Sequence, residues 1–343
     1  MSRPAFPTNL LAFQRQFSSD EACYEYVRDS RWPDGFRCPT CGHPDAYPRG
    51  KRKQVECAKC GYCVSVTAGT VMANTKVQLR AWLTAAWLMV TSKGGHSSSE
   101  LERQIGVSHE TAFTMLHKLR HAMVAPERTP LRGRVEVDES YVGGPEPGRP
   151  GRGAETKMMI VGAVEDRGDR GRENRAGRVR FRLVEKGDAE NLKRFVREVV
   201  EPGSLILTDG HRAYSGLSGY RHSVASSTGD ALRHYHIAVS NLKAWLKGTH
   251  HGRVEVKHLQ AYLNEFAFRY NRRHNLAAAF QTMLGLSGKV GEFTYRDIYA
   301  DVPAHPNPTP ARRRAALRRA PAGRVPSRSL RLKAVERPEP SRR

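Results

Sequence analysis

The chain has 343 residues, of which 39% are hydrophobic, and its formal net charge at pH 7 is +23. This composition predicts a soluble protein of two or three domains, and no apolar run reaches the roughly 20 residues of a membrane-spanning helix. Because the first residues also lack an apolar signal core, we expect a cytoplasmic protein with no membrane contact. The basic excess favours nucleic acid as partner over a ribosome or an anionic lipid surface.

The charge is unevenly distributed along the chain. Residues 303–343 contain twelve Arg or Lys and two Glu, which leaves +10 in this segment and +13 in the rest. Pro, Arg and Ala dominate the segment and large apolar residues are few, so we expect a disordered basic tail. The remainder of the chain is basic on its own and therefore suited to bind phosphates.

Residues 1–30 are expected to contain an N-terminal helix. Ser18-Ser19-Asp20-Glu21 has the pattern of a capping box, in which serine and acidic side chains satisfy backbone N–H groups at a helix start. The helix itself is predicted over 22–27.

Residues 31–75 are predicted to form a zinc ribbon. Two Cys-x-x-Cys pairs, Cys38/Cys41 and Cys57/Cys60, are separated by 15 residues, as expected for two knuckles that close one tetrahedral Zn²⁺ site. A glycine follows the second cysteine of each pair and permits a tight turn that brings backbone N–H groups toward the sulfurs. Cys63 is an alternative ligand but lacks that glycine, and buried free thiols are the alternative to a metal. A ribbon serves DNA binding, protein contact or folding alone.

Residues 76–126 are predicted to be a helical, helix-turn-helix-like region. Apolar residues recur at helical spacing over 76–92, and two capped helices flank a turn at Gly106 within 97–123. A plain structural hairpin has the same pattern. If the pair binds DNA, six side chains of the second helix face the groove: His109, Glu110, Thr111, Thr114, His117 and Lys118.

Residues 127–302 are predicted to be a mixed α/β domain. Four strands are indicated by alternating or short apolar runs at 135–137, 158–164, 179–184 and 205–207. Helices are predicted over 188–200 and 256–272, and Gly- and charge-rich loops over 144–155 and 166–176.

Two carboxylates stand at the ends of predicted strands. Asp138 follows Val135-Glu136-Val137, and Asp209 follows Leu205-Ile206-Leu207-Thr208. Carboxylates at neighbouring strand ends can hold Mg²⁺, and a pair of such ions can stabilise both oxygens of a phosphodiester displacement. Taken singly, each Asp is an ordinary strand-end or turn residue.

Over residues 10–300 the chain resembles the zinc-ribbon group of bacterial insertion-sequence transposases. The resemblance rests on five segments: Arg31-Trp-Pro-Asp-Gly-Phe-Arg-Cys-Pro-Thr-Cys-Gly42, Thr67-Ala-Gly-Thr-Val71, Val135-Glu-Val-Asp-Glu-Ser-Tyr-Val-Gly-Gly144, Thr208-Asp-Gly210, and Lys257 to Arg273. It implies a ribonuclease H-like catalytic domain in which Asp138 and Asp209 are the first two metal-binding acids of an Asp-Asp-Glu type transposase.

The third active-site residue has two candidates. Members of the group often have Asn or His in place of Glu, with a Lys seven residues later, and His236 and Lys243 fit this spacing on one face of a helix. Glu265, followed seven residues later by Arg272, is the rival and a better Mg²⁺ ligand. His236 is favoured because Glu265 lies 56 residues beyond Asp209. The 27 residues from Asp209 to His236 are fewer than the group leads us to expect, so an inactive copy is an alternative.

The resemblance implies an insertion-sequence transposase that acts as a homo-oligomer on double-stranded DNA. It would bind the terminal inverted repeats and target DNA, and would cleave and transfer strands with Mg²⁺ or Mn²⁺, besides its structural zinc. The alternatives are a non-catalytic zinc-ribbon DNA-binding regulator derived from a transposase, and a structure-specific nuclease.

Overall fold

The computed structural model describes residues 5–49, 54–124, 128–143, 158–168, 175–225, 232–251, 254–286 and 291–299. The described chain forms two compact units, the first made of residues up to 128 together with 268–299, and the second of 129–267. The predicted tail 303–343, and most of the predicted loops 144–155 and 166–176, lie outside the described residues. Within the described ranges, no helix has the length and apolar character needed to cross a membrane.

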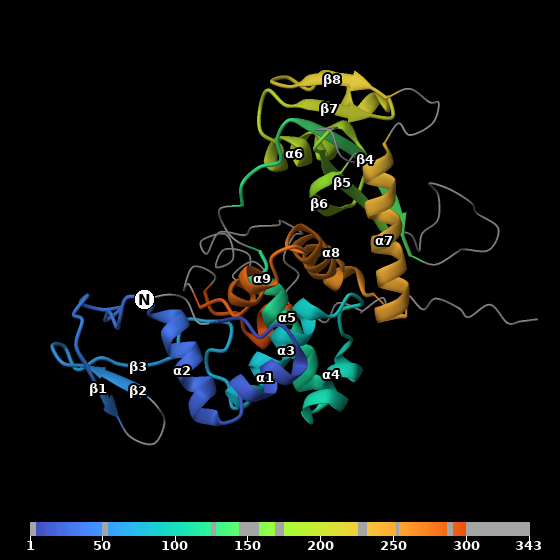
Figure 1. Cartoon of the computed structure of the whole chain (residues 1–343). Coiled ribbons are helices and arrows are strands. Elements are labelled where there is room, and N and C mark those ends of the chain that lie inside the picture. The colour runs from blue at the N-terminus through green and yellow to red at the C-terminus, as the bar shows by residue number, and fades with distance from the viewer. Residues whose placement is uncertain are drawn as a thin grey trace, which may run out of the picture. The chain divides into compact units, whose positions relative to one another are not determined.

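The first unit begins with two short helices and a small sheet (Figure 1). Helix α1 spans Leu10–Gln16 and α2 spans Asp20–Arg31; the Ser19 hydroxyl accepts a hydrogen bond from Ala22 N–H, which confirms the predicted cap. Strands β1 (Ala46–Arg49), β2 (Gln54–Cys57) and β3 (Cys63–Ser65) form an antiparallel three-stranded sheet.

The four predicted cysteines meet in one cluster. Their ligand atoms all lie within 4.8 Å of one another, and two opposite Sγ pairs, Cys38–Cys60 and Cys41–Cys57, are each 3.6 Å apart. Gly42 and Gly61 take the predicted left-handed turns, with φ of 72° and 68°. A tetrahedral thiolate set of this kind is typical of zinc.

Backbone donors favour the ionised form of one thiol in the cluster. Burial opposes ionisation of Cys38, but hydrogen bonds from Cys41 and Thr40 N–H and from neighbouring thiols together lower its pKa to about 6. A thiolate is the form that binds a metal, so Cys38 is the thiol prepared for one, whereas, against a hydrogen bond from Tyr62 N–H, burial and hydrogen bonds with the other thiols raise the pKa of Cys60 to about 12.

A bundle of helices completes the first unit. Helix α3 (Leu79–Thr91) corresponds to the predicted helix 76–92, and α4 (Ser98–Ile105) and α5 (His109–Ala122) form the predicted pair around Gly106, whose φ is 68°. Helices α9 (Leu276–Met283) and α10 (Tyr295–Tyr299) come from the far end of the chain. They lie in the same unit as α1–α5.

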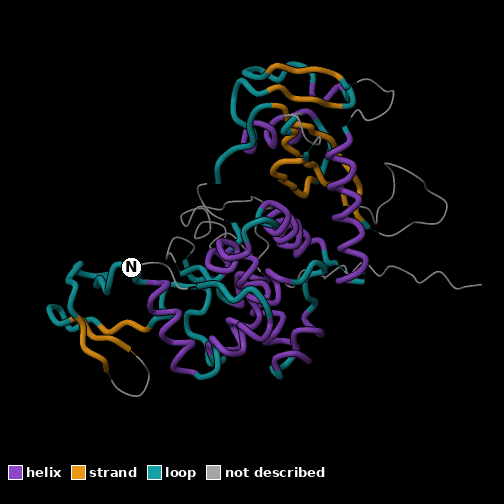
Figure 2. The backbone as a smooth tube through the Cα atoms, viewed as in Figure 1, coloured by secondary structure: helices purple, strands orange, loops and turns teal. Residues whose placement is uncertain are grey.

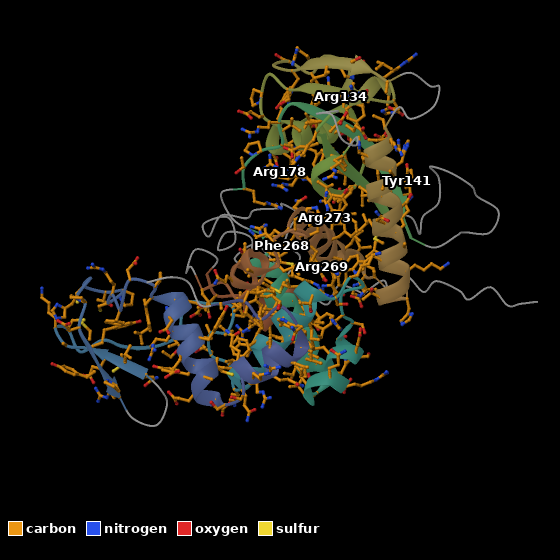
Figure 3. The ribbon with its side chains drawn as sticks, in the orientation of Figure 1. Arg134, Tyr141, Arg178, Phe268, Arg269 and Arg273 are labelled. Atoms are coloured by element: carbon orange, nitrogen blue, oxygen red, sulfur yellow. The ribbon has the colours of Figure 1, made fainter. Side chains whose placement is uncertain are left out.

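The core of the first unit therefore joins distant parts of the sequence. Phe280 of α9 is fully buried, with its ring centroid 5.6 Å from that of Phe6 and 5.9 Å from that of Tyr26. Phe268, Arg269 and Arg273, labelled in Figure 3, lie on the final turns of α8 (Val256–Asn271) and just beyond it. Arg269 donates to the carbonyl oxygens of Ser92 and Lys93.

The second unit is built on a five-stranded mixed sheet (Figure 2). Its strand order is β6-β5-β4-β7-β8, where β4 (Arg134–Val142), β5 (Met158–Asp166) and β6 (Ala176–Val184) are antiparallel neighbours. Strands β7 (Leu205–Thr208) and β8 (Arg221–Val224) run parallel to β4. The four predicted strands are confirmed, and β8 is an additional edge strand. The predicted position of Asp138 at a strand end is wrong, because β4 continues to Val142 by pairing with β5 and Asp138 lies within it.

Helices pack against this sheet on residues that alternate along β4. Val135 and Val137 are buried in a cluster with Leu192, Phe195 and Val196 of α6 (Ala189–Val199), the predicted helix 188–200. The intervening residues Glu136, Asp138 and Ser140 point to the opposite face, because strand side chains alternate. There they contact α7 (Arg233–His250), which runs beside β4 in Figure 1.

Zinc retention should depend on Cys60 and not on Cys63. Among the described residues of 33–65 only Cys38, Cys57 and Val64 are buried, so the metal replaces a hydrophobic core in this segment. We expect Cys60→Ser to lose bound zinc and the hydrogen-exchange protection of β1–β3, while Cys63→Ser keeps one zinc per chain. Zinc content by mass spectrometry of the native protein tests this, and loss of zinc in Cys63→Ser would contradict the ligand set.

Helix α9 should stabilise the N-terminal helices. Phe280→Ala removes a fully buried ring and should lower the free energy of unfolding of the first unit by about 3–5 kcal/mol. Native-state hydrogen exchange should show lost protection in α1 and α2 but not in β5 of the second unit. The control Tyr295→Ala removes a ring that is 46% exposed and should have little effect. Unchanged protection of α2 in Phe280→Ala would refute this packing role.

Candidate active site

Asp138 and Asp209 come together through the parallel pairing of β4 and β7. The register pairs Val135 with Ile206 and Glu136 with Leu207, so two further steps along both strands place Asp209 opposite Asp138. The Asp209 carboxylate accepts a hydrogen bond from His211 N–H at 2.9 Å, which holds the turn after β7. Gly210 in this turn has φ of +88°, and a Cβ there would lie 2.9 Å from Val224 Cγ1.

The electrostatic environment of Asp138 is unusual for an aspartate. Burial raises its pKa to about 6, with further contributions from the negative charges of Asp209 and Glu139, against the opposing influence of Glu139 N–H and His236. The side chain is nevertheless 15% exposed. A cation close to Asp138 would therefore stabilise its ionised carboxylate.

His236 and Lys243 project from α7 toward the same face of β4. His236 Nε2 lies 3.6 Å from Asp138 Oδ2, and its side chain is 65% exposed. Lys243 Nζ donates to Ser140 Oγ at 3.3 Å, two residues further along β4. The structure thus places both predicted residues beside the strand that carries Asp138.

Glu265 and Arg272 have different surroundings. Glu265 lies on α8 in the second unit and is fully buried, with 0% of its surface exposed. Arg272 belongs to the first unit, where its guanidinium lies 4.5 Å from the ring centroid of Phe268.

Two further glutamates of β4 escaped prediction. Glu136 is buried, and its carboxylate accepts hydrogen bonds from the His234 ring nitrogen Nδ1 (2.9 Å) and from Tyr235 N–H (2.8 Å). On the other face of β4, Glu139 accepts a hydrogen bond from Tyr214 OH at 2.8 Å. The hydrogen-bond partners of both glutamates are far away in the sequence. The sequence therefore contained no local sign of these contacts beyond the segment Val135-Glu-Val-Asp-Glu139 itself.

The donor set around Asp138 suits a hard divalent cation. Two carboxylates lie near each other there with an imidazole beside them, and a cation would offset both the burial that raises the pKa of Asp138 and the added repulsion from Asp209. Asp138, Asp209 and His236 are not among the described groups whose ligand atoms lie within 4.8 Å of one another; apart from the cysteines, that tighter group is Glu136, Asp166 and His234. The arrangement around Asp138 is thus more open.

The predicted groove-facing residues of α5 are only partly accessible. Glu110, Thr111, Thr114 and Lys118 line a hollow together with Thr75, Val77, Trp82 and Met115. His117, however, is buried at 4% exposure, so its prediction as a groove contact is wrong. Helix α5 packs against neighbours on two sides. His117 lies on a different side from the hollow, next to Phe113, with 4.4 Å between the two ring centroids.

Comparison with known families identifies two parts of the chain. Residues 130–271 match the family described as "ISXO2-like transposase domain", and residues 18–63 match the family described as "Transposase zinc-ribbon domain". Comparison with curated proteins gives no match. The first segment contains Asp138, Asp209 and His236, and the second contains all four clustered cysteines.

These matches and the two sheets confirm the predicted fold class: an N-terminal zinc ribbon, a helical segment and an α/β domain of the ribonuclease H-like type. Residues 18–63 and 130–271 therefore carry the two domains of a zinc-ribbon insertion-sequence transposase, as the sequence resemblance implies.

Proposed function

We propose that the protein cleaves DNA at the ends of an insertion sequence and joins these ends to target DNA. The observation that carries this proposal is the placement of Asp138 and Asp209 on adjacent parallel strands, with His236 and Lys243 beside them, within a transposase domain. Two carboxylates, one within β4 and one directly after β7, with an imidazole and a lysine beside them, suit metal-assisted reactions at a phosphodiester.

Asp138 and Asp209 would hold the catalytic cation, Mg²⁺ or Mn²⁺. Bound there, the cation would supply charge stabilisation to the reacting phosphate and would favour ionisation of the attacking oxygen. The raised pKa of Asp138 supports this role, because burial, together with the negative charges of Asp209 and Glu139, disfavours the ionised carboxylate that a bound cation would stabilise.

His236 is the favoured third residue of the site. Its imidazole is exposed and lies beside Asp138, where it can contact either the cation or the DNA phosphate. Glu265 is fully buried, so neither DNA nor a solvated cation reaches it in this structure. Lys243, held near Ser140, would contact the DNA backbone as a point charge.

The chemistry consists of two displacements at phosphorus in the same site. In the first, water attacks a phosphodiester at the element end, the bond to the 3′ oxygen breaks, and that oxygen leaves as a 3′-hydroxyl. In the second, this hydroxyl attacks a target phosphodiester, forms a new ester bond and displaces the target's 3′ oxygen. Asp138 and Asp209 would hold the cation in both steps, so the same site would position the reacting phosphate for each displacement.

Recognition of the element ends would fall to the first unit. The zinc ribbon, together with the exposed Glu110 and the half-buried Lys118 of α5, would contact the terminal inverted repeats, and the net charge of +23 supports salt-dependent binding. Joining two ends to one target requires more than one active site, so we propose a homo-oligomer assembled on DNA. The site of action would be the cytoplasm, where bacterial DNA lies.

Asp138 should be essential for both displacements. Asp138→Asn should reduce Mg²⁺-dependent cleavage of end-containing DNA, and joining of pre-cut ends, by at least about 100-fold, since it removes charge stabilisation at the reacting phosphate. Glu185→Gln, an exposed residue after β6, is the matched control. Gel assays with labelled oligonucleotides measure both products.

The outcomes separate the rival functions. Cleavage without joined product from pre-cut ends would favour a structure-specific nuclease. Specific end binding with neither product in the wild-type protein would indicate a regulator or an inactive copy.

Substitution of His236 should affect the cleavage rate, whereas substitution of Glu265 should affect stability. His236→Ala should lower the cleavage rate while the melting temperature stays unchanged, because the side chain is exposed. Glu265→Gln should retain cleavage in the folded fraction, with any effect appearing as a change in stability. The assignment fails if Glu265→Gln abolishes cleavage at an unchanged melting temperature while His236→Ala remains active.

A further inference from the structure

The first turn of α7 is anchored by the sheet and not by its own sequence. The N-cap residue Leu232 makes no capping hydrogen bond with its side chain, although the first N–H groups of any helix lack partners within the helix. Glu136 of β4 supplies the partner, because its Oε2 accepts from Tyr235 N–H at 2.8 Å. Its Oε1 lies 2.9 Å from His234 Nδ1, and a carboxylate accepts, so the ring donates.

This anchor sets the register between α7 and β4. Glu136 and Asp138 are two residues apart on the same face of the strand, and His234 and His236 are two residues apart at the start of the helix. Residues two apart on a helix point in different directions, so the backbone of the first turn sets the register: Glu136 holds Tyr235 N–H, and the next residue, His236, lies beside Asp138 at a nitrogen-to-oxygen distance of 3.6 Å. Both anchor side chains are almost fully buried, at 3% and 4% exposure, so water does not compete for these bonds.

We propose that Glu136 is a positioning residue of the active site, which holds the start of α7 through His234 and Tyr235 and thereby places His236 beside Asp138. This inference rests on the proposed function, in which His236 works next to the cation held by Asp138 and Asp209. Glu136 itself touches neither the cation nor the DNA in this account.

A metal site is the competing explanation for the same residues, because Glu136, Asp166 and His234 lie within ligand distance of one another. Each carboxylate oxygen of this trio is already engaged. Asp166 Oδ1 accepts from Gly168 N–H at 2.9 Å, and Asp166 Oδ2 pairs with Arg134 Nε at 2.9 Å. Arg134, labelled in Figure 3, also adds a positive charge that opposes a cation, so the trio is better described as a hydrogen-bond network, although His234 Nε2 is buried without a hydrogen-bond partner among the described residues.

The test uses Mn²⁺ as a paramagnetic probe in the full-length protein with ¹³C-labelled histidines. Mn²⁺ bound at Asp138 and Asp209 should broaden the His236 resonance, and also that of His222, whose Nε2 lies 2.9 Å from Thr208 Oγ1 beside Asp209. His222 belongs to β8 and does not depend on α7, so it serves as an internal reference. His236→Gln and His222→Gln assign the two resonances.

In Glu136→Leu, the broadening of His236 should fall at least severalfold while that of His222 persists. Glu136→Gln should retain most of the His236 broadening, because its amide oxygen can accept from Tyr235 N–H and its amide nitrogen can donate to His234 Nδ1. A role in stability alone would not separate His236 from His222 in this way. His234→Asn removes only the ring anchor and offers a milder variant, in which His236 broadening should fall partially.

Unchanged His236 broadening in folded Glu136→Leu, or in His234→Asn if Glu136→Leu does not fold, would overturn the positioning role. A Mn²⁺ site at Glu136, Asp166 and His234 would also overturn it, and would appear as broadening of His234 that survives Asp138→Asn. If Mn²⁺ broadened neither the His236 nor the His222 resonance in the wild-type protein, the proposed cation site at Asp138 and Asp209 would instead be contradicted.

Discussion

The parallel pairing of β4 with β7 is the constraint on which the rest of the site depends. It brings Asp209 opposite Asp138 although 71 positions separate them in the sequence. Strand β4 can occupy this central position because its other edge pairs with β5 along nine residues, from Arg134 to Val142. The strand that carries the first acid is therefore paired along both of its edges.

Because side chains alternate along β4, its two faces have different roles. Val135 and Val137 join the hydrophobic cluster under α6, which contributes the burial that stabilises the sheet. On the opposite face, polar side chains of the same strand contact α7 through hydrogen bonds and ion pairs, beside the buried apolar residues of that helix such as Ala238 and Leu242. Burial on this face destabilises an isolated negative charge, and it raises the pKa of Asp138 to about 6. A cation at this point, and the anionic DNA that follows it, would complete the charge balance.

Features with local causes were predictable from the sequence, and features with distant causes were not. Helices α2, α3, α5 and α8, and the cysteine cluster, follow from caps, periodic apolar residues and ligand spacing within short windows. The start of α7 has no such mark, since Leu232 is a poor cap and the partner Glu136 is 98 residues from His234. Likewise, nothing near Phe280 indicates that its ring packs with Phe6 and Tyr26, and the burial of His117 depends on a second packed side of α5.

The central claim is that Asp138 and Asp209 share a catalytic cation with His236 beside it. The most direct measurement is anomalous scattering from Mn²⁺ in crystals of the protein bound to pre-cut element-end DNA. The account predicts a manganese peak in contact with carboxylate oxygens of both Asp138 and Asp209, near the 3′-hydroxyl of the DNA, with the His236 ring adjacent. A peak coordinated by Glu265, or by Glu136, Asp166 and His234 with Asp138 unligated, would contradict it.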